Sequence, residues 1–337
     1  MKRKKEEKRR KKLRTLILLL FLTIIMFGTS TYAWFTANRT VTIQSLDVHV
    51  EASNGLQIST DANNWKSVIT NADITTNAYS THTNMVPANV TAVSTDGVVD
   101  SSTGKLKMYK PVIGTDATTG DYNITTSLDT EAKGSTGNYI AFDIFLRVDS
   151  NMPIYLTSDS KVTVKADTED KGLKNASRVA FVKQGHGAST DSVSSLIALN
   201  NEIAEKAIIW EPNSDAHTPI VTSQVAPEYG VTIGNSTTSP DTYTNYTGVN
   251  KAITTAVDLK ELVNGTNTTD ATAVTPNIRT TANNTTYNSI FTLQQGVTKF
   301  RVYMWVEGQD IDCENNATGS DISYTIQLST LDAPVTP

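Results

Sequence analysis

The stretch YIAFDIFLRV, residues Tyr139–Val148, decides the fold class of this 337-residue chain. Every second residue is large and apolar, and the residues between them include Asp143 and Arg147. The apolar residues of this alternation are Ile140, Phe142, Ile144, Leu146 and Val148. A period of two is typical of a β-strand with one buried face, so the other face is predicted to meet water.

A second stretch, KFRVYMWV at Lys299–Val306, alternates in the same way. Shorter runs rich in Thr, Val, Ile and Tyr suit a pleated, half-buried surface and predict further strands. These runs are residues 41–50, 56–59, 153–157, 162–165, 178–182, 207–210 and 322–328. Helical periodicity is confined to residues 192–206, with Asp191 as N-cap, and residues 256–263. The sequence therefore predicts an all-β fold, a β-sandwich or jelly roll with one or two short helices.

Long polar stretches rich in Thr, Asn and Ser separate these strands, at about residues 70–137 and 214–286. Loops of this length are unusual inside a compact domain. Because Thr and Asn also suit exposed strands and turns, we interpret both stretches as insertions on one β-sandwich domain. That domain is predicted to cover residues 39–330, and residues 331–337 form a tail.

The N-terminus has the pattern of a secretory signal peptide. Ten Lys and Arg residues within residues 1–14 precede the apolar run LILLLFLTIIMF at 16–27, and small residues follow up to Ala33. Cleavage between Ala33 and Trp34 would release the chain after passage through the Sec translocon. Alternatively, the mostly apolar residues 13–35 form an uncleaved anchor helix, long enough to span a bilayer. The protein is therefore predicted to be secreted, or to lie on the extracellular face of the plasma membrane.

Loss of residues 1–33 changes the charge of the protein. Ten basic and two acidic residues leave, so 19 basic and 32 acidic residues remain and the net charge becomes −13. Nucleic-acid binding requires a basic surface, which argues against a nucleic-acid partner. Membrane contact is predicted only through the leader.

The sequence shows no pattern of catalytic or metal-binding residues. The sequence lacks a pair of histidines at the spacing that binds zinc on a helix. It also lacks a nucleophile elbow and a phosphate-binding glycine loop. The turns at residues 61–64 and 310–312 could offer oxygen ligands to Ca²⁺, but we favour solvated turns built by Asx hydrogen bonds. A single cysteine, Cys313, is predicted to be buried. We therefore predict no enzyme activity, no metal and no cofactor.

Two tryptophans, Trp65 and Trp210, lie beside turn residues. Exposed tryptophans can stack on sugar rings, which makes both candidates for glycan binding. A tryptophan at a strand end more often closes the core of a sandwich, and we favour that alternative.

Three segments resemble a known group of exported proteins. GTSTYAWFT at residues 28–36 resembles the export junction of the TasA/camelysin group of Gram-positive bacteria, which a SipW-type signal peptidase processes. ASNGLQISTDANNW at 52–65 resembles the early strands of such proteins. FRVYMWVEGQDIDCEN at 300–315 resembles the closing segment of clostridial surface proteins of this kind.

The resemblance implies a jelly-roll subunit that assembles into extracellular fibres. Residues 34–45 would be the donor strand that completes the sheet of a neighbouring copy, with Trp34, Phe35, Val41 and Ile43 as its apolar residues. Our hypothesis is an exported, non-enzymatic structural protein of the cell surface or biofilm matrix. A surface adhesin or carbohydrate-binding module is the alternative. A secreted metallopeptidase, as described for camelysins, is less favoured because this sequence has no recognisable ligand set.

Overall fold

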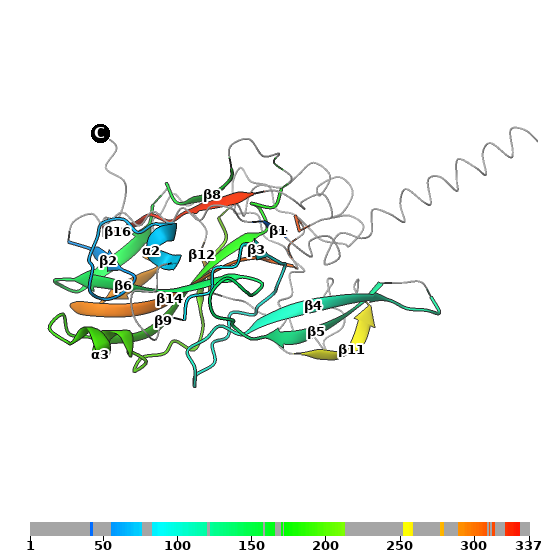
Figure 1. The fold of residues 1–337 in the computed structure, drawn as a ribbon, viewed down its shortest axis with the longest axis horizontal. Coiled ribbons are helices and arrows are strands. Elements are labelled where there is room, and N and C mark those ends of the chain that lie inside the picture. Colours follow the sequence, from blue (N-terminus) through cyan, green and yellow to red (C-terminus); the bar gives the residue numbers. More distant parts are fainter. Residues whose placement is uncertain are drawn as a thin grey trace, which may run out of the picture.

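The computed structural model of the protein has strands throughout its described parts. These parts are residues 41–42, 55–75, 83–119, 122–157, 159–165, 170, 172–212, 252–258, 277–279, 289–308, 310, 312–313 and 321–330. Their two helices, α2 (Asn71–Thr75) and α3 (Val193–Ile197), are short, and almost all strand pairs are antiparallel (Figure 1). The predicted all-β class is therefore confirmed.

A six-stranded sheet, in the order β12-β10-β9-β14-β6-β2, forms the centre of the fold. Its strands are β2 (Gln57–Ser59), β6 (Ile140–Val148), β9 (Ser177–Gly187), β10 (Ile208–Trp210), β12 (Asn277–Arg279) and β14 (Gly296–Val306). β14 lies between β6 and β9 and pairs antiparallel with both. The two stretches with the clearest alternation in the sequence are thus neighbours in the middle of this sheet.

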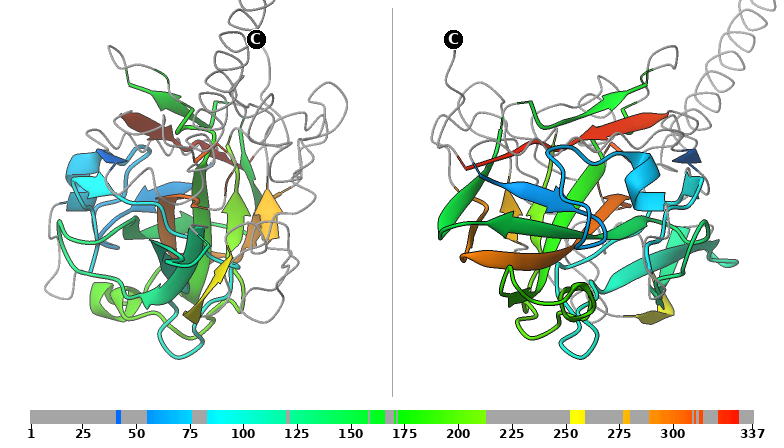
Figure 2. Two further views of the ribbon diagram at one scale, coloured as in Figure 1. Left: turned by 90° about the vertical axis from the view of Figure 1, so that its right-hand side faces the viewer. Right: turned by 60° about the vertical axis from the view of Figure 1, so that its left-hand side comes forward.

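A second layer of strands covers one face of the central sheet, and Figure 2 shows β15 of this layer in red. The strands of the layer are β7 (Met152–Leu156), β8 (Lys161–Val164), β13 (Phe291–Leu293), β15 (Ile322–Thr325) and β16 (Leu328–Ser329). Phe142, Phe181 and Phe300 of the sheet lie in one apolar core with Ile154 and Leu328 of the second layer. Burial of this face is what the alternation in the sequence predicts.

The opposite face of the sheet is buried as well, so the predicted wet side of β6 is wrong. Tyr139 and Phe145 have no exposed surface, and Asp143 has 5 %. Residues of the segment 83–108 cover one half of this face, and α3 covers the other (Figure 2). The covering segment belongs to a polar stretch whose sequence gives no sign that it folds back onto the sheet.

Three strands project from the body as an antiparallel sheet, which we call the arm (Figure 1). They are β4 (Met108–Thr115), β5 (Tyr122–Asp129) and β11 (Ile253–Asp258), in the order β11-β5-β4. β4 and β5 belong to the polar stretch 70–137 and β11 to the stretch 214–286, so the two stretches meet in one sheet. Ala256, predicted as the start of a helix, lies in β11, and that prediction is wrong for the described residues.

The helix predicted at residues 192–206 is reduced to α3. Its N-cap is Ser192 rather than Asp191, because the Ser192 hydroxyl accepts a hydrogen bond from the N–H of Ser195 at 3.2 Å. Beyond α3, the N–H of Ala204 donates to the carbonyl of Lys183 on β9. Backbone pairing with the sheet therefore replaces the later turns of the predicted helix.

Candidate functional site

The predicted donor strand has a partner within its own chain. Val41 and Thr42 form β1, which pairs antiparallel with β3 (Asn89–Val90). Val41 lies opposite Val90, and Thr42 lies opposite Asn89. Val90 is fully buried in the core between the two layers, whereas Asn89 is exposed. We call β1 and β3 the terminal pair.

The chain on both sides of β3 is fixed to the rest of the fold. Met85 exchanges two backbone hydrogen bonds with Ala141 of β6, at 2.7 and 2.9 Å. After β3, the N–H of Thr91 donates to the carbonyl of Asn138 at 2.9 Å, and the Thr91 hydroxyl donates to the side chain of Asn138 at 2.8 Å. β3 is therefore a firmly held edge, which lowers the entropic cost of pairing with another strand.

A group of buried charges, the Arg301 network, fixes the start of the segment that leads to β3. Arg301 on β14 donates from Nε and Nη2 to Glu131, at 3.1 and 2.7 Å, and from Nη1 to Asp143 at 2.7 Å. Its Nη2 also donates to the carbonyl of Thr83 at 3.1 Å. The side chains of Arg301, Glu131 and Asp143 are 4 %, 2 % and 7 % exposed. The planar guanidinium thus joins β14, β6 and two covering segments.

The Arg301 network also holds the base of the arm. Lys105 Nζ lies 3.3 Å from the Glu131 carboxylate. The Tyr303 hydroxyl donates to Glu131 and accepts a hydrogen bond from the N–H of Leu106 at 3.0 Å. Lys105 and Leu106 precede β4 and Glu131 follows β5, so both ends of the hairpin are attached to the central sheet.

Burial and charge oppose each other in the Arg301 network. Burial disfavours the ionised form of Asp143, but Arg301 and Lys299, whose Nζ lies 3.5 Å away, outweigh it and lower the pKa of Asp143. Burial also disfavours the charge of Arg301, yet the carboxylates of Asp143 and Glu131 raise its pKa. Burial, followed by the charge of Glu131, raises the pKa of Tyr303. The network consequently holds Asp143 and Arg301 charged and Tyr303 neutral.

A second buried ion cluster lies around Arg178 on β9, whose side chain is 3 % exposed. Arg178 Nη2 donates to Asp310 and lies 2.8 Å from Glu211 Oε1. Asp310 accepts the N–H of Asp312 at 2.8 Å, and neither aspartate has exposed surface. The predicted Asx hydrogen bond is thus present at 310–312, but the predicted exposure of this turn to solvent is wrong, because Arg178 compensates the charge of Asp310 inside the protein. Within the described residues, no group of three His, Cys, Asp or Glu side chains could hold a metal ion.

The turn at residues 61–64 has the predicted Asx form. Asp61 Oδ1 accepts the N–H groups of Asn63 and Asn64 at 2.9 and 2.7 Å. Burial disfavours the Asp61 carboxylate, but these hydrogen bonds outweigh it and lower the pKa of Asp61. The turn leads the chain back, so that Lys66 and Ile58 exchange backbone hydrogen bonds at 3.0 and 2.8 Å. The outer edge of β2 is covered in this way.

The two tryptophans predicted for glycan stacking are engaged within the protein. Trp210 has no exposed surface and lies in the core between the layers, so its stacking role is wrong and the core alternative holds. Its Nε1 has no hydrogen-bond partner among the residues that the structure describes. Trp65 is half-buried against Phe145 and Leu196, and the Arg147 guanidinium lies 4.1 Å from its ring centroid. Arg147 therefore occupies one face of the Trp65 ring, where a sugar would otherwise stack.

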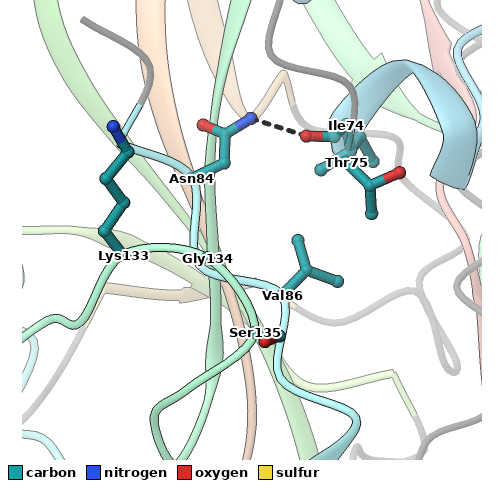
Figure 3. Close-up of a pocket in the computed structure, with 7 residues that line it drawn as sticks. All are labelled: Ile74, Thr75, Asn84, Val86, Lys133, Gly134 and Ser135. Carbon is teal, nitrogen blue, oxygen red and sulfur yellow. Dashed lines mark hydrogen bonds between the residues drawn. The ribbon is translucent and has the colours of Figure 1, made fainter.

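A pocket of about 190 Å³ lies beside the segment that leads to β3 (Figure 3). It is lined by Ile74, Thr75, Asn84, Val86, Lys133, Gly134 and Ser135. The Asn84 amide donates to the carbonyl of Ile74, and its Oδ1 accepts the N–H of Asp143, each at 3.0 Å. Because small-molecule sites usually measure about 300–1,000 Å³, and because Asn84 already has protein partners, this pocket is a weak candidate for a ligand site.

No protein-family model, curated protein or solved structure matches this chain.

Several predicted residues lie outside the described parts of the chain. They are the cleavage position Ala33–Trp34, the donor residues Trp34, Phe35 and Ile43, the remainder of the leader, and residues 331–337. Cys313 is described and buried, as predicted. Among the described helices, none has the length and apolar character needed to cross a bilayer.

Proposed function

We propose that this chain is an exported, non-enzymatic structural protein of the cell surface or biofilm matrix, whose copies join by exchanging N-terminal strands. The terminal pair is the observation that carries the proposal, because β1 already adds to β3 by main-chain pairing. Within the described residues two residue pairs hold β1, and such a short strand can leave and pair with the same edge on another copy. Each copy would then donate its β1 to one neighbour and accept the β1 of another. Such head-to-tail contacts extend into a fibre when they do not close into a ring.

The leader supports export and supplies a free strand. We infer cleavage between Ala33 and Trp34 by a SipW-type signal peptidase after passage through the Sec translocon, on the resemblance of residues 28–36 to TasA/camelysin junctions. Cleavage would place residues 34–45 at a new terminus, where a strand is unrestrained on one side. The product would be secreted, or would remain on the extracellular face of the membrane if the leader is retained.

The fold described above is compatible with a subunit of a fibre. We infer that its two layers form a β-sandwich of the jelly-roll type, as the resemblance implies. The Arg301 network contributes by fixing Thr83 and Asp143 near the start of the segment that presents β3. The edge of β3 would keep its shape while strands exchange. It would therefore pair with β1 of a second copy in the same way as with β1 of its own chain.

Electron microscopy and light scattering of two chains test the proposal. One chain spans residues 34–337 and should form fibres. The other carries Val41→Pro and Thr42→Pro in the same chain and should remain monomeric. Two consecutive prolines disable β1 because main-chain groups alternate along a strand, so one proline must fall at a hydrogen-bonded position.

A peptide provides the matched control. Added to the proline variant, a peptide of residues 34–45 should occupy the edge of β3 and protect the amides there from hydrogen exchange, and the same peptide with both prolines should not. Monomers of the 34–337 chain at all concentrations, indifferent to the prolines, would overturn the proposal. Sequencing of the protein recovered from culture medium should give Trp34 as its first residue.

A further inference from the structure

The pairing register shows which main-chain groups of β4 face outward from the arm. β4 pairs with β5 on one side without a register shift. On its other side, Tyr109 exchanges backbone hydrogen bonds with Ser94, at 2.8 and 2.9 Å. The N–H and C=O of Tyr109 therefore point away from β5. Because these groups alternate along an antiparallel strand, the C=O of Pro111 and the N–H and C=O groups of Ile113 and Thr115 point outward too.

Proline at position 111 leaves the arm intact and interrupts its outer edge. Pro111 lies opposite Thr126, in a pair that needs no hydrogen bond between β4 and β5. On the outer side it is the first outward position after Tyr109, and it has no N–H to donate. The pairing with Ser94 ends at this point. Beyond Tyr109, no described strand pairs with the outer edge of β4.

We propose that Pro111 blocks the open edge of the arm against pairing with the arm of a second copy. The excluded partner is an identical β4 strand, since two edges related by a two-fold axis are self-complementary. An unprotected edge here would favour association, because Val112 and Leu128 of the arm are 60 % and 53 % exposed. Proline at an edge strand is a known means of preventing such pairing.

This role of Pro111 goes beyond the proposed function and does not depend on it. The edge of β2 is covered by Lys66, and the edge of β4 would be closed by Pro111. The chain would thereby restrict self-association through these two sheets, whether or not the terminal pair exchanges between copies.

The substitution Pro111→Thr tests the proposal, because it restores an outward N–H without adding apolar surface. It is introduced into the chain of residues 34–337 that carries Val41→Pro and Thr42→Pro, so that strand exchange cannot contribute. Sedimentation velocity should show dimers or larger species at a concentration about tenfold lower than for the parent. Hydrogen exchange of the Ile113 and Thr115 amides should slow in the associated species.

Lys110→Thr is the matched control. It removes a charged side chain from the same strand, but the N–H of residue 110 points toward β5, so the outer edge keeps its gap and association should not change. Equal association of Lys110→Thr and Pro111→Thr would assign the protection to charge and overturn the proposal. A folded Pro111→Thr variant that associates no more than its parent would overturn it as well. Comparison of this parent with the 34–337 chain that lacks Val41→Pro and Thr42→Pro reports separately on strand exchange.

Discussion

Arg301 occupies a position on β14 where its neighbours on the same face, Tyr303 and Trp305, are buried aromatic residues. A charge at such a position is stable only if partners surround it, because the interior solvates ions poorly. Glu131 and Asp143 supply these partners from two other segments. Removal of the arginine would leave two carboxylates with too few partners in the interior.

Arg301→Met should therefore lower the free energy of unfolding by about 3–5 kcal/mol, measured by urea denaturation. Lys183→Met is the control on β9, because the side chains of Lys183 and its partner Glu202 are 31 % and 41 % exposed. That change should cost at most about 1 kcal/mol. Equal losses in the two variants would show that the Arg301 network does not act as a buried ion cluster.

Asp143 gives the network a pH dependence whose sign follows from its lowered pKa. A carboxyl whose pKa is lower in the folded than in the unfolded state stabilises the protein above the unfolded pKa. This stabilisation should disappear as the pH falls below about 5 and through the lowered pKa of folded Asp143. Asp143→Asn should be less stable than the wild type at pH 7, and the difference should shrink across this window in urea titrations. A difference that stays constant from about pH 7 to below about pH 4 would contradict this role of Asp143.

Trp210 and Trp65 should differ in what they contribute to stability. Trp210→Ala removes a fully buried ring and should cost about 3–5 kcal/mol in urea denaturation. Trp65→Ala removes a half-buried ring stacked on Arg147 and should cost less. A Trp210→Ala protein as stable as the wild type would contradict the place of this ring in the core.

The element that differs most from the body is the arm. Its hairpin is attached to the central sheet at its base, through Lys105, Leu106 and Glu131. Farther out, Lys110, Val112 and Ser127 are exposed. Stability is accordingly expected to fall along the hairpin from its base to its tip.

Replacement of residues 111–126 by Asn-Gly should leave the body folded. Lys110 and Ser127 lie opposite each other, in a hydrogen-bonded pair that a two-residue turn can close. Urea denaturation should remain cooperative, with a loss of no more than about 2 kcal/mol. Loss of cooperative unfolding would mean that the arm belongs to the core. The Arg301→Met variant is the contrast, since it cuts the attachment at the base.

The sequence could predict the elements whose apolar pattern is local. Residues 139–148 and 299–306 alternate because one face of each meets a second layer. β4 and β5 lack such a pattern and are partly exposed, so the sequence does not predict them as strands. Glu131 could not be found either, because its partner Arg301 is 170 residues away. The helix predicted at 192–206 is too long, because its later residues pair with the backbone of β9 instead of extending the helix.

The whole molecule is strongly acidic once residues 1–33 are removed, with 19 basic and 32 acidic residues. Every copy of the 34–337 chain would carry the same net charge of −13, so approach of two such copies would be opposed by repulsion over a distance set by the salt concentration. At about 0.1 M salt the screening length is about 10 Å, and at about 0.01 M it is about 30 Å. Association through a backbone pair, which carries no charge complementarity of its own, should therefore be limited by this repulsion at low salt.

Fibre elongation by the 34–337 chain should accelerate about tenfold between about 20 mM and about 200 mM NaCl, as followed by light scattering from preformed seeds. The free energy of unfolding, measured over the same range, should change far less, because the Arg301 network is buried and weakly screened. A rate that falls with salt would indicate attraction between oppositely charged surfaces of neighbouring copies. Such attraction would replace backbone pairing as the main determinant of assembly, so the salt dependence discriminates between the two ways in which this acidic chain could recognise itself.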